Sequence, residues 1–256
     1  MELNGTICVV TGAAGGIGAA MARRFKAAGA AAVVVADVQA EPLRAVAEEI
    51  GGLAVTCDVT KEPDIIALAA AAADAYGPID VFCSNAGIAR NGGEESPDAL
   101  WQLNWDLHVM AHVYAARTVA PKMAARGSGY LVNTASAAGL LSHLDSATYA
   151  VTKHAAVAFA EWLAITYGDR GVRVSVLCPQ AVRTAMTAGH EDSVASVDGM
   201  IEADQVADDV LAAMAAEDFL ILPHPEVREY IQRKAGDYDR WLGGMRKLRR
   251  RMAKGE

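Results

Sequence analysis

Hydrophobic positions along the chain form short runs that alternate with longer stretches of helical periodicity. The short runs are rich in Val, Ile and Leu, which is typical of strands buried on both faces of a parallel sheet. We expect strands over residues 6–11, 32–37, 53–57, 79–84, 129–135, 172–178 and 219–222. Helical patterns cover residues 16–28, 40–50, 62–76, 98–126, 148–169 and 203–217. This alternation predicts an α/β fold with helices on both faces of one parallel sheet.

Glycine and polar residues follow the predicted strands at the points where the strands end. They are Gly12, Asp37, Asp58, Asn85, Ser136 and Pro179. Ligands of such sheets bind beyond the carboxyl ends of the strands. We therefore expect these six residues to meet at one edge of the sheet.

The first strand is followed directly by a glycine-rich turn and then by a helix. Gly12, Gly16 and Gly18 have the spacing G-x-x-x-G-x-G, which is more open than the common G-x-G-x-x-G. Glycines let the backbone approach a diphosphate, and the N-terminus of the helix offers free N–H groups and the positive end of its dipole. The segment therefore predicts a nucleotide site.

Asp37 ends the second predicted strand, about 20 residues after the glycines, which is the spacing of a carboxylate that holds the adenosine ribose diol. The same carboxylate would repel a 2′-phosphate, so we expect NAD to be preferred over NADP. The alternative is that Asp37 only caps the next helix.

Tyr149 and Lys153 are four residues apart in the predicted helix 148–169, so they lie one turn apart on the same face. A free phenol has a pKa of about 10, and lowering it to about 7 takes about 4 kcal/mol. One ammonium group at about 4 Å supplies roughly that energy at an effective dielectric constant near 20. The pair predicts an acid/base if a reactive group binds beside it. A surface pair with the same spacing is the alternative.

Six motifs, in order, resemble those of the short-chain dehydrogenase/reductase family, and the resemblance covers residues 1–223. They are Thr11-Gly12-x-x-x-Gly16-x-Gly18, Cys57-Asp58-Val59, Asn85-Ala86-Gly87, Ser136, Tyr149-x-x-x-Lys153 and Cys178-Pro179-Gln180-Ala181-Val182-Arg183-Thr184. The resemblance implies a doubly wound, Rossmann-type sheet of seven parallel strands. The NAD-binding residues that it implies are Gly12, Gly16, Ile17, Gly18, Asp37, Asp58, Val59, Asn85, Ala86, Gly87, Tyr149, Lys153, Pro179, Val182 and Thr184.

The same resemblance implies four catalytic residues, namely Ser136, Tyr149, Lys153 and His108. Ser136 would bind the substrate oxygen, and Tyr149 would move the alcohol proton. Lys153 would lower the pKa of Tyr149 and bind the nicotinamide ribose. Further contacts are implied for the adenine at Asp58 and Val59, for the adenosine ribose at the backbone of residues 85–87, and for the nicotinamide at residues 179–184.

Two positions depart from the family pattern. His108 stands where the family has an Asn whose main-chain carbonyl holds a water that links the lysine to solvent. A histidine keeps that carbonyl but changes the side-chain bonds, while Asn104 lies one helical turn too early to replace the Asn. Gln180 replaces a Gly, which would narrow or polarise the substrate pocket.

Two further histidines raise the question of other chemistry. His112 follows His108 at a spacing that can bind a metal, but no carboxylate or cysteine completes a ligand set, so we expect no metal site. His143 lies between Ser136 and Tyr149, and we expect it to form a wall of the substrate pocket rather than to act as an acid/base. The segments expected to face the substrate are 90–96, 138–146 and 183–202.

Composition agrees with an enzyme of small molecules. The net charge of −8 argues against nucleic acid as a partner, and there is no apolar run of about 18 residues to suggest a membrane span. The four cysteines form no C-x-x-C pair, so we expect free, buried thiols in a reducing compartment. With no secretory signal predicted, we expect the protein in the cytoplasm.

The main domain covers residues 1–223 and includes a substrate loop at 183–202. Residues 224–256 form an extension with helical periodicity. It holds 10 Lys and Arg and 5 Asp and Glu, a charge of +5 against −13 for the remainder. We weigh three roles for it: a helix packed on the acidic body or on a partner subunit, a contact with nucleic acid or membrane, and a cover over the substrate mouth.

The sequence thus predicts an NAD-dependent oxidoreductase that moves a hydride between a secondary alcohol or ketone and the nicotinamide. One alternative is an epimerase or dehydratase with tightly bound NAD, and another is a non-catalytic NAD-binding protein. The expected partner is a small alcohol or ketone, and a homodimer or homotetramer is expected.

Overall fold

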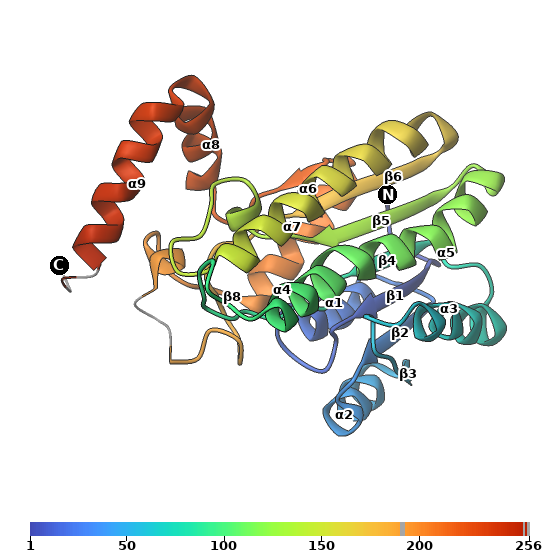
Figure 1. The fold of residues 1–256 in the computed structure, drawn as a ribbon. Helices are drawn as coiled ribbons and strands as arrows, with labels where there is room; N and C mark the ends of the chain where they lie inside the picture. Colours follow the sequence, from blue (N-terminus) through green and yellow to red (C-terminus); the bar gives the residue numbers. More distant parts are fainter. Residues whose placement is uncertain (190–192, 253, 255–256) are drawn as a thin grey trace.

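The computed structural model describes residues 1–189, 193–252 and 254 of the chain. Within this part of the chain, seven parallel strands form one sheet in the order β3-β2-β1-β4-β5-β6-β9 (Figure 1). The strands are β1 (Ile7–Thr11), β2 (Ala32–Asp37), β3 (Leu53–Thr56), β4 (Val81–Ser84), β5 (Gly129–Thr134), β6 (Val172–Leu177) and β9 (Leu220–Ile221). A second pair, β7 (Val182–Arg183) and β8 (Ile201–Glu202), lies outside this sheet. The predicted doubly wound α/β fold is confirmed.

Helices cover both faces of the sheet. They are α1 (Gly16–Ala27), α2 (Ala40–Ile50), α3 (Glu62–Tyr76), α4 (Asp98–Trp105), α5 (Ala111–Arg126), α6 (Ala147–Tyr167) and α7 (Ala203–Ala216), followed by α8 (Glu226–Gly236) and α9 (Tyr238–Met252). One core cluster packs α1, α2 and α7 onto the sheet, and the other packs α3, α5 and α6 onto the opposite face.

The central strand β1 shows why these segments are apolar throughout. Successive side chains of a strand point to opposite faces. Cys8 and Val10 accordingly belong to one core cluster, and Val9 belongs to the other. Because both faces are covered by helices, the strand is a continuous apolar run rather than an alternating one.

The strand order reverses beside β1, which pairs with β2 on one side and with β4 on the other. In doubly wound sheets the crevice beyond the carboxyl ends of the strands at such a reversal is the ligand site. The turn after β1 contains Gly12, and the turn after β4 contains Asn85. The topology therefore brings the predicted nucleotide turn and the Asn85 segment to the same crevice.

The single predicted helix over residues 98–126 is wrong in one respect. The structure has α4, then a π-helical turn at Asp106–Met110, then α5. A π-helical turn holds one more residue than an α-helical turn and often occurs at functional sites. Apolar periodicity over a long helix does not reveal one inserted residue, which explains the error.

The extension after residue 223 is helical, as predicted, but it forms two helices rather than one. The break falls at Asp237, whose carboxylate accepts a hydrogen bond from the backbone N–H of Arg240 at 2.9 Å. This is the bond of an N-terminal capping residue, so Asp237 begins α9. Figure 1 shows α9 standing apart from the layers that cover the sheet.

All four cysteines are buried and free. Burial raises the pKa of Cys8, Cys57 and Cys178 to about 12. Thiols with such a pKa carry almost no thiolate at neutral pH, so they are expected to be unreactive.

Among the described residues, no helix combines the length and the apolar character that crossing a membrane demands.

Candidate active site

The turn between β1 and α1 brings three backbone segments close together. Gly12 has a φ of 67°, and a Cβ there would lie 2.7 Å from the Cα of Ala86. A Cβ on Gly18 would lie 2.2 Å from the carbonyl oxygen of Gly12. Both positions therefore require glycine. Gly15, in contrast, has no atom within 4 Å of its Cβ position, so the space at the N-terminus of α1 is open.

This open helix terminus fits the diphosphate of a dinucleotide. The first N–H groups of a helix have no partner within the helix, and the dipole favours a bound anion. The Asp37 carboxylate lies against the same turn, where it accepts hydrogen bonds from the N–H of Ala14 at 3.1 Å and of Gln39 at 3.0 Å. Gln39, not Asp37, is the N-cap residue of α2.

Asn85 joins three strands at the head of the crevice. Its Nδ2 donates to the carbonyl of Thr11 at 3.1 Å, and its Oδ1 accepts from the hydroxyl of Thr134 at 3.0 Å. The backbone N–H groups of Asn85 and Ala86 both donate to the Thr11 hydroxyl. Asn85 thus fixes the ends of β1, β4 and β5 relative to one another and holds Ala86 against Gly12.

Asp58 uses its carboxylate within its own turn. One oxygen accepts from the backbone and the hydroxyl of Thr60, at 3.1 Å and 2.7 Å, and the other pairs with Lys61 at 3.1 Å. Burial raises the pKa of Asp58, but the bonds from Thr60 and Lys61 together bring it below its ordinary value. The neighbouring Val59 is buried. Both residues are therefore rigidly placed.

Ser136 and Tyr149 are brought together by two neighbouring turns. Ser136 follows β5, and its hydroxyl accepts from the N–H of Ala138 at 3.1 Å and donates to the carbonyl of Pro179 at 3.3 Å. Tyr149 lies in the first turn of α6, where its N–H donates to the capping hydroxyl of Ser146 at 3.2 Å. The Ser136 side chain lies close enough to the Tyr149 phenol to lower its pKa.

Lys153 lies one turn after Tyr149 and is 97% buried. Its Nζ donates to the carbonyl of Thr134 at 3.0 Å and lies 5.6 Å from the centre of the Tyr149 ring. Burial lowers the pKa of Lys153 to about 8. The lysine is therefore still mostly protonated at neutral pH, although its surroundings disfavour the charge.

The expectation that the ammonium of Lys153 lowers the pKa of Tyr149 left out the burial of the phenol. Burial raises the pKa of Tyr149 above its ordinary value of 10, and the nearby Ser136 side chain only partly opposes this. The physical reason is that removing the phenol from water disfavours its charged form. The sequence argument counted the attraction of the ammonium but not this desolvation.

His108 lies beside Tyr149 and Lys153, within the π-helical turn. Its ring meets that of Tyr149 edge-on, with centroids 5.3 Å apart. A Cβ on Gly87 would lie 3.6 Å from the imidazole and 3.7 Å from the Nζ of Lys153. Burial, together with the charge of Lys153, lowers the pKa of His108 to about 2. His108 is therefore neutral and adjoins both Tyr149 and the Asn85–Gly87 segment.

The other histidine of the predicted pair, His112, is also buried. Burial and the charge of Lys153 lower its pKa to about 3. Neither ring nitrogen has a hydrogen-bond partner within the described residues.

The segment after β6 closes the crevice from the other side. A Cβ on Gly16 would lie 3.0 Å from the Cγ2 of Thr184, so this threonine touches the glycine turn. The carbonyl of Pro179 accepts from the Ala137 N–H at 2.9 Å, and Val182 is buried. The segment therefore bridges the nucleotide turn and the Ser136 turn.

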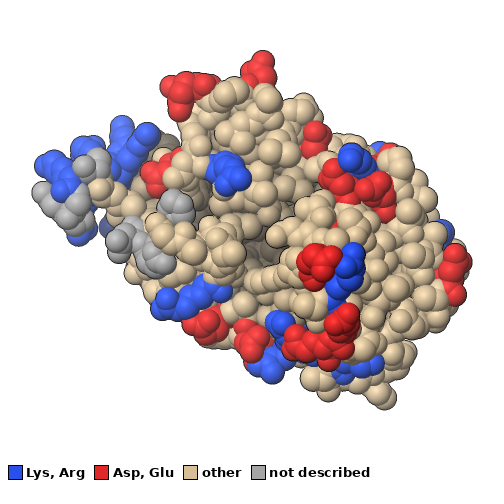
Figure 2. Space-filling view, turned by 90° about the horizontal axis from the view of Figure 1, so that it is seen from below, with Lys and Arg blue, Asp and Glu red and all other residues tan. Residues whose placement is uncertain are grey.

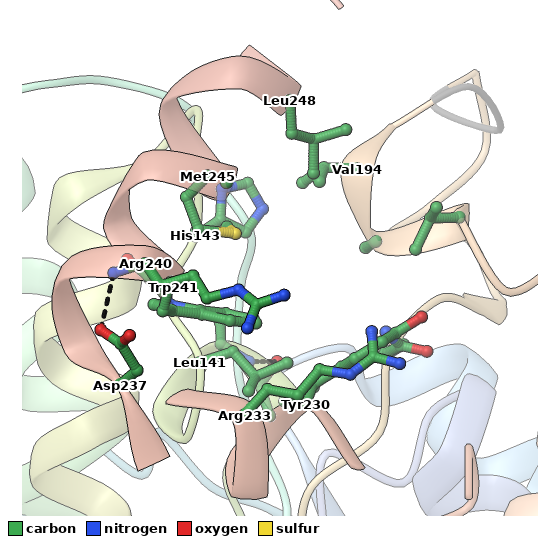
Figure 3. Close-up of a pocket in the computed structure, with 18 of the residues that line it drawn as sticks. Leu141, His143, Val194, Tyr230, Arg233, Asp237, Arg240, Trp241, Met245 and Leu248 are labelled. Carbon is green, nitrogen blue, oxygen red and sulfur yellow. Dashed lines mark hydrogen bonds between the residues drawn. The ribbon is translucent and has the colours of Figure 1, made fainter. Parts of the chain in front are cut away.

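A cavity of about 980 Å³ opens beside Ser136 (Figure 3). His143 and Gln180 line it, as does part of the predicted substrate loop at Val194, Ala195 and Val197. The His143 ring meets that of Tyr149 edge-on at 5.7 Å. His143 thus lies in the cavity wall next to the phenol. Residues 190–192 of the predicted loop lie outside the described residues.

The sequence did not indicate which residues of the extension reach this cavity. Helices α8 and α9 contribute Tyr230, Arg233, Arg240, Trp241, Met245 and Leu248 to its lining. The amphipathic pattern of the extension was visible, but the surface that its apolar side covers depends on the tertiary fold. The extension thus forms part of the wall of this cavity in its own chain.

The fold and these side chains together define an α/β oxidoreductase with a nucleotide crevice. The family model for short chain dehydrogenase matches residues 6–195, and the chain belongs to that family.

Three comparisons each extend over most of the chain. It is 37% identical over 238 residues to a 1-deoxy-11-beta-hydroxypentalenate dehydrogenase from Streptomyces exfoliatus, covering 89% of this chain and 86% of the relative. It is 32% identical over 189 residues to a 7alpha-hydroxysteroid dehydrogenase from Escherichia coli strain K12, covering 72% and 74%. A crystal structure of a short-chain dehydrogenase/reductase from Burkholderia phymatum in complex with NAD is similar in fold, with a TM-score of 0.86 and 29% identity over 93% of this chain and 96% of that one.

Proposed function

We propose that this short-chain dehydrogenase is an NAD-dependent oxidoreductase that interconverts a secondary alcohol and its ketone. The observation that carries the proposal is the position of Tyr149 beside Ser136 and His143, which both line a cavity of about 980 Å³. Bound NAD supplies a carbon that accepts the hydride lost by the alcohol.

Tyr149 is the acid/base of this reaction. In oxidation its phenolate takes the hydroxyl proton while the carbon–hydrogen bond breaks, and in reduction its phenol returns a proton to the carbonyl oxygen. Ser136 donates a hydrogen bond to the same substrate oxygen and holds it at the phenol. In the structure the Ser136 hydroxyl donates to Pro179 at 3.3 Å, a long bond that substrate can replace.

Lys153 stabilises the phenolate by its charge and donates to the nicotinamide ribose. Its Nζ has three donors, and Thr134 takes one at 3.0 Å. His108 holds the neighbouring backbone of Ile88 in place, accepting its N–H at 3.2 Å. We assign it a positioning role in the active site rather than a proton-transfer role.

NAD is bound by the crevice between the glycine turn and the Asn85–Gly87 segment. Gly12, Gly16, Ile17 and Gly18 present the α1 terminus to the diphosphate, while Asp58 and Val59 contact the adenine. Pro179, Val182 and Thr184 close over the nicotinamide. The Asp37 carboxylate accepts hydrogen bonds from the adenosine ribose and repels a 2′-phosphate, so NAD is preferred over NADP.

The protein is a homodimer or homotetramer in this proposal. Helices α4 and α6 leave large apolar side chains exposed, which is costly for a monomer in water. They are Leu103, Trp105, Val151, Trp162 and Ile165. The four free cysteines suit a reducing compartment, and we place the protein in the cytoplasm. Sedimentation of the wild type and of Ile165→Asp tests the assembly.

The direct test uses alcohols that carry deuterium on the hydroxyl-bearing carbon. A panel of steroid, terpene and aryl alcohols is incubated with NAD, and NADH is followed by its near-ultraviolet absorbance and by mass. We expect NADH that contains one deuterium. Release of an epimer or a dehydrated product without net NADH would contradict the proposal, as would NAD binding without any turnover.

A further inference from the structure

The cavity beside Ser136 is a composite of three parts of the chain. Ser136, Ala137 and Ala138 lie at its catalytic end, the 194–197 segment forms one wall, and α9 forms another. Its volume of about 980 Å³ is at the upper end of the range for sites that take drug-sized ligands. The site is therefore large enough for a molecule of several rings.

Helix α8 holds α9 in place over this cavity. Val227 of α8 is fully buried and belongs to a small core cluster with Ala137 and Leu141, next to the catalytic serine. Lys234 donates to the carbonyl of Leu140 at 2.7 Å, and the Tyr230 hydroxyl donates to Asp198 at 2.8 Å. The extension is thus anchored both to the Ser136 turn and to the loop on the opposite wall.

Most of the lining is apolar. The apolar lining residues include Leu141, Val194 and Val197, together with Trp241, Met245 and Leu248 from α9. Such a surface favours the hydrocarbon part of a ligand and disfavours a small polar alcohol such as a sugar.

Two cationic side chains break this apolar lining. Figure 3 shows the guanidinium groups of Arg233 and Arg240 directed into the cavity. Arg240 has no ion pair within the described residues, while Arg233 pairs with Glu229 on its own helix. Figure 2 shows Lys and Arg side chains gathered at the end of the molecule that α9 occupies.

The charge of Arg233 is offset by Glu229, whereas Arg240 has no such partner among the described residues. Among the described residues that line the cavity, Asp237 is the only acidic one, and it accepts the backbone N–H of Arg240 at the start of α9. Burial lowers the pKa of His143 and keeps it neutral. Arg240 is therefore the lining arginine whose guanidinium has no ion-pair partner among the described residues.

We propose that the substrate is a mid-sized, largely apolar alcohol or ketone that also carries a carboxylate, and that Arg240 binds this carboxylate with Arg233 beside it. The inference rests on the proposed oxidoreductase function, because it takes the reacting oxygen to lie at Ser136 and Tyr149. A guanidinium donates two parallel hydrogen bonds to a carboxylate, so Arg240 fixes orientation as well as charge. Both arginines keep solvent-exposed surface, so the bound carboxylate stays partly hydrated.

The test compares each acid with its own methyl ester. Hydroxylated steroid, terpenoid and alicyclic acids are assayed as such pairs, and the quantity measured is the ratio of kcat/KM for acid to that for ester. Pairs that are not turned over are compared by calorimetric titration into the NAD complex. We expect the wild type to favour at least one acid over its ester by about 10-fold or more, the range of hydrogen bonds to charged groups.

Arg240→Gln should lower this ratio by about 10-fold. The acid loses its charged contact with the guanidinium, whereas the ester has no such contact to lose. Arg246→Gln is the matched control, since Arg246 lies on the same helix but does not line the cavity. It should leave the ratio within about twofold. A general disturbance of α9 would lower kcat/KM for acid and ester alike and would not move the ratio.

Three results would overturn the inference. They are a panel in which no acid reacts or binds better than its ester, an Arg240→Gln variant with an unchanged ratio, and an equal fall of the ratio in both variants. The last result would show a long-range effect of the basic helix. Failure of the proposed function would look different, because then neither acids nor esters would yield NADH.

Discussion

The imidazole of His108 and the hydroxyl of Thr152 are hydrogen-bonded, with Nδ1 and Oγ1 3.0 Å apart. The Thr152 proton is already donated to the carbonyl of Thr148 at 2.8 Å, and the His108 Nε2 accepts from the Ile88 N–H. His108 therefore carries its proton on Nδ1. His108 thus connects the backbone of Ile88, which follows Gly87, to the side chain of Thr152, which precedes Lys153.

Loss of His108 should cost stability. His108→Ala leaves the Ile88 N–H without its acceptor and Thr152 without a donor, and each buried unpaired group costs about 1–3 kcal/mol. We expect a lower free energy of unfolding in urea with an unchanged slope. His108→Asn, which keeps a donor and an acceptor, should recover part of the loss. Equal stability of wild type and His108→Ala would refute the structural role.

The pH profile should not depend on His108. Burial holds its pKa at about 2, so it stays neutral through the range in which the enzyme works. Oxidation instead needs the Tyr149 phenolate, and burial raises the pKa of that phenol. We expect kcat/KM for oxidation to rise with pH and that for reduction to fall. Oxidation that slows with increasing pH would exclude Tyr149 as the base.

Lys153→Met should shift the pH profile of oxidation to higher pH. The pKa of Lys153 is about 8 beside the neutral phenol. Once the phenolate forms it favours the ammonium, so the two charged groups stabilise each other. Without the ammonium, the rise in oxidation should occur at higher pH. The measurement is the pH dependence of kcat/KM for wild type and variant, with protein folding checked by circular dichroism. Identical midpoints would show that Lys153 does not act on Tyr149.

Cofactor choice should depend on the charge at Asp37. Asp37→Ala is expected to weaken NAD binding and to raise the activity with NADP relative to that with NAD by about 10-fold. This is the factor that corresponds to one hydrogen bond to a charged group. Asp37→Asn keeps an acceptor for the Ala14 N–H and removes only the charge, so it separates the two effects. An unchanged NADP to NAD ratio in both variants would mean that Asp37 does not contact the ribose.

The buried thiols offer an independent test of the core. All four are free, and burial raises their pKa values far above neutral. We expect a thiol-specific reagent to label none of them in the native protein and all four after unfolding in guanidinium. Rapid labelling of a native cysteine would contradict the packing around the strand that contains it.

The sequence predicted the sheet well because each strand is a local apolar run that ends at a recognisable residue. Asp37 and Asn85 are examples: Asp37 ends the run Ala-Val-Val-Val-Ala, Asn85 follows Val-Phe-Cys-Ser, and both lie beside the glycine turn. The strand predicted over residues 32–37 has the same first and last residues in the structure. Local pattern sufficed because the strands are buried on both faces and their order follows from handed connections.

The parts that the sequence did not predict depend on long-range packing. No local pattern shows that Arg240 and Trp241 lie across a cavity from Ser136, since more than 100 residues separate them. The π-helical turn around His108 inserts a residue that periodicity cannot detect. The raised pKa of Tyr149 follows from burial, which the Tyr149–Lys153 spacing does not reveal.

The most direct test of the account is the activity of Tyr149→Phe measured beside its NAD affinity. The substitution removes one hydroxyl, so calorimetry should find NAD binding within about threefold of wild type, while turnover should fall by about 100- to 10,000-fold, the contribution of a general acid/base. Turnover close to that of the wild type would contradict the assignment of Tyr149 and with it the proposed chemistry.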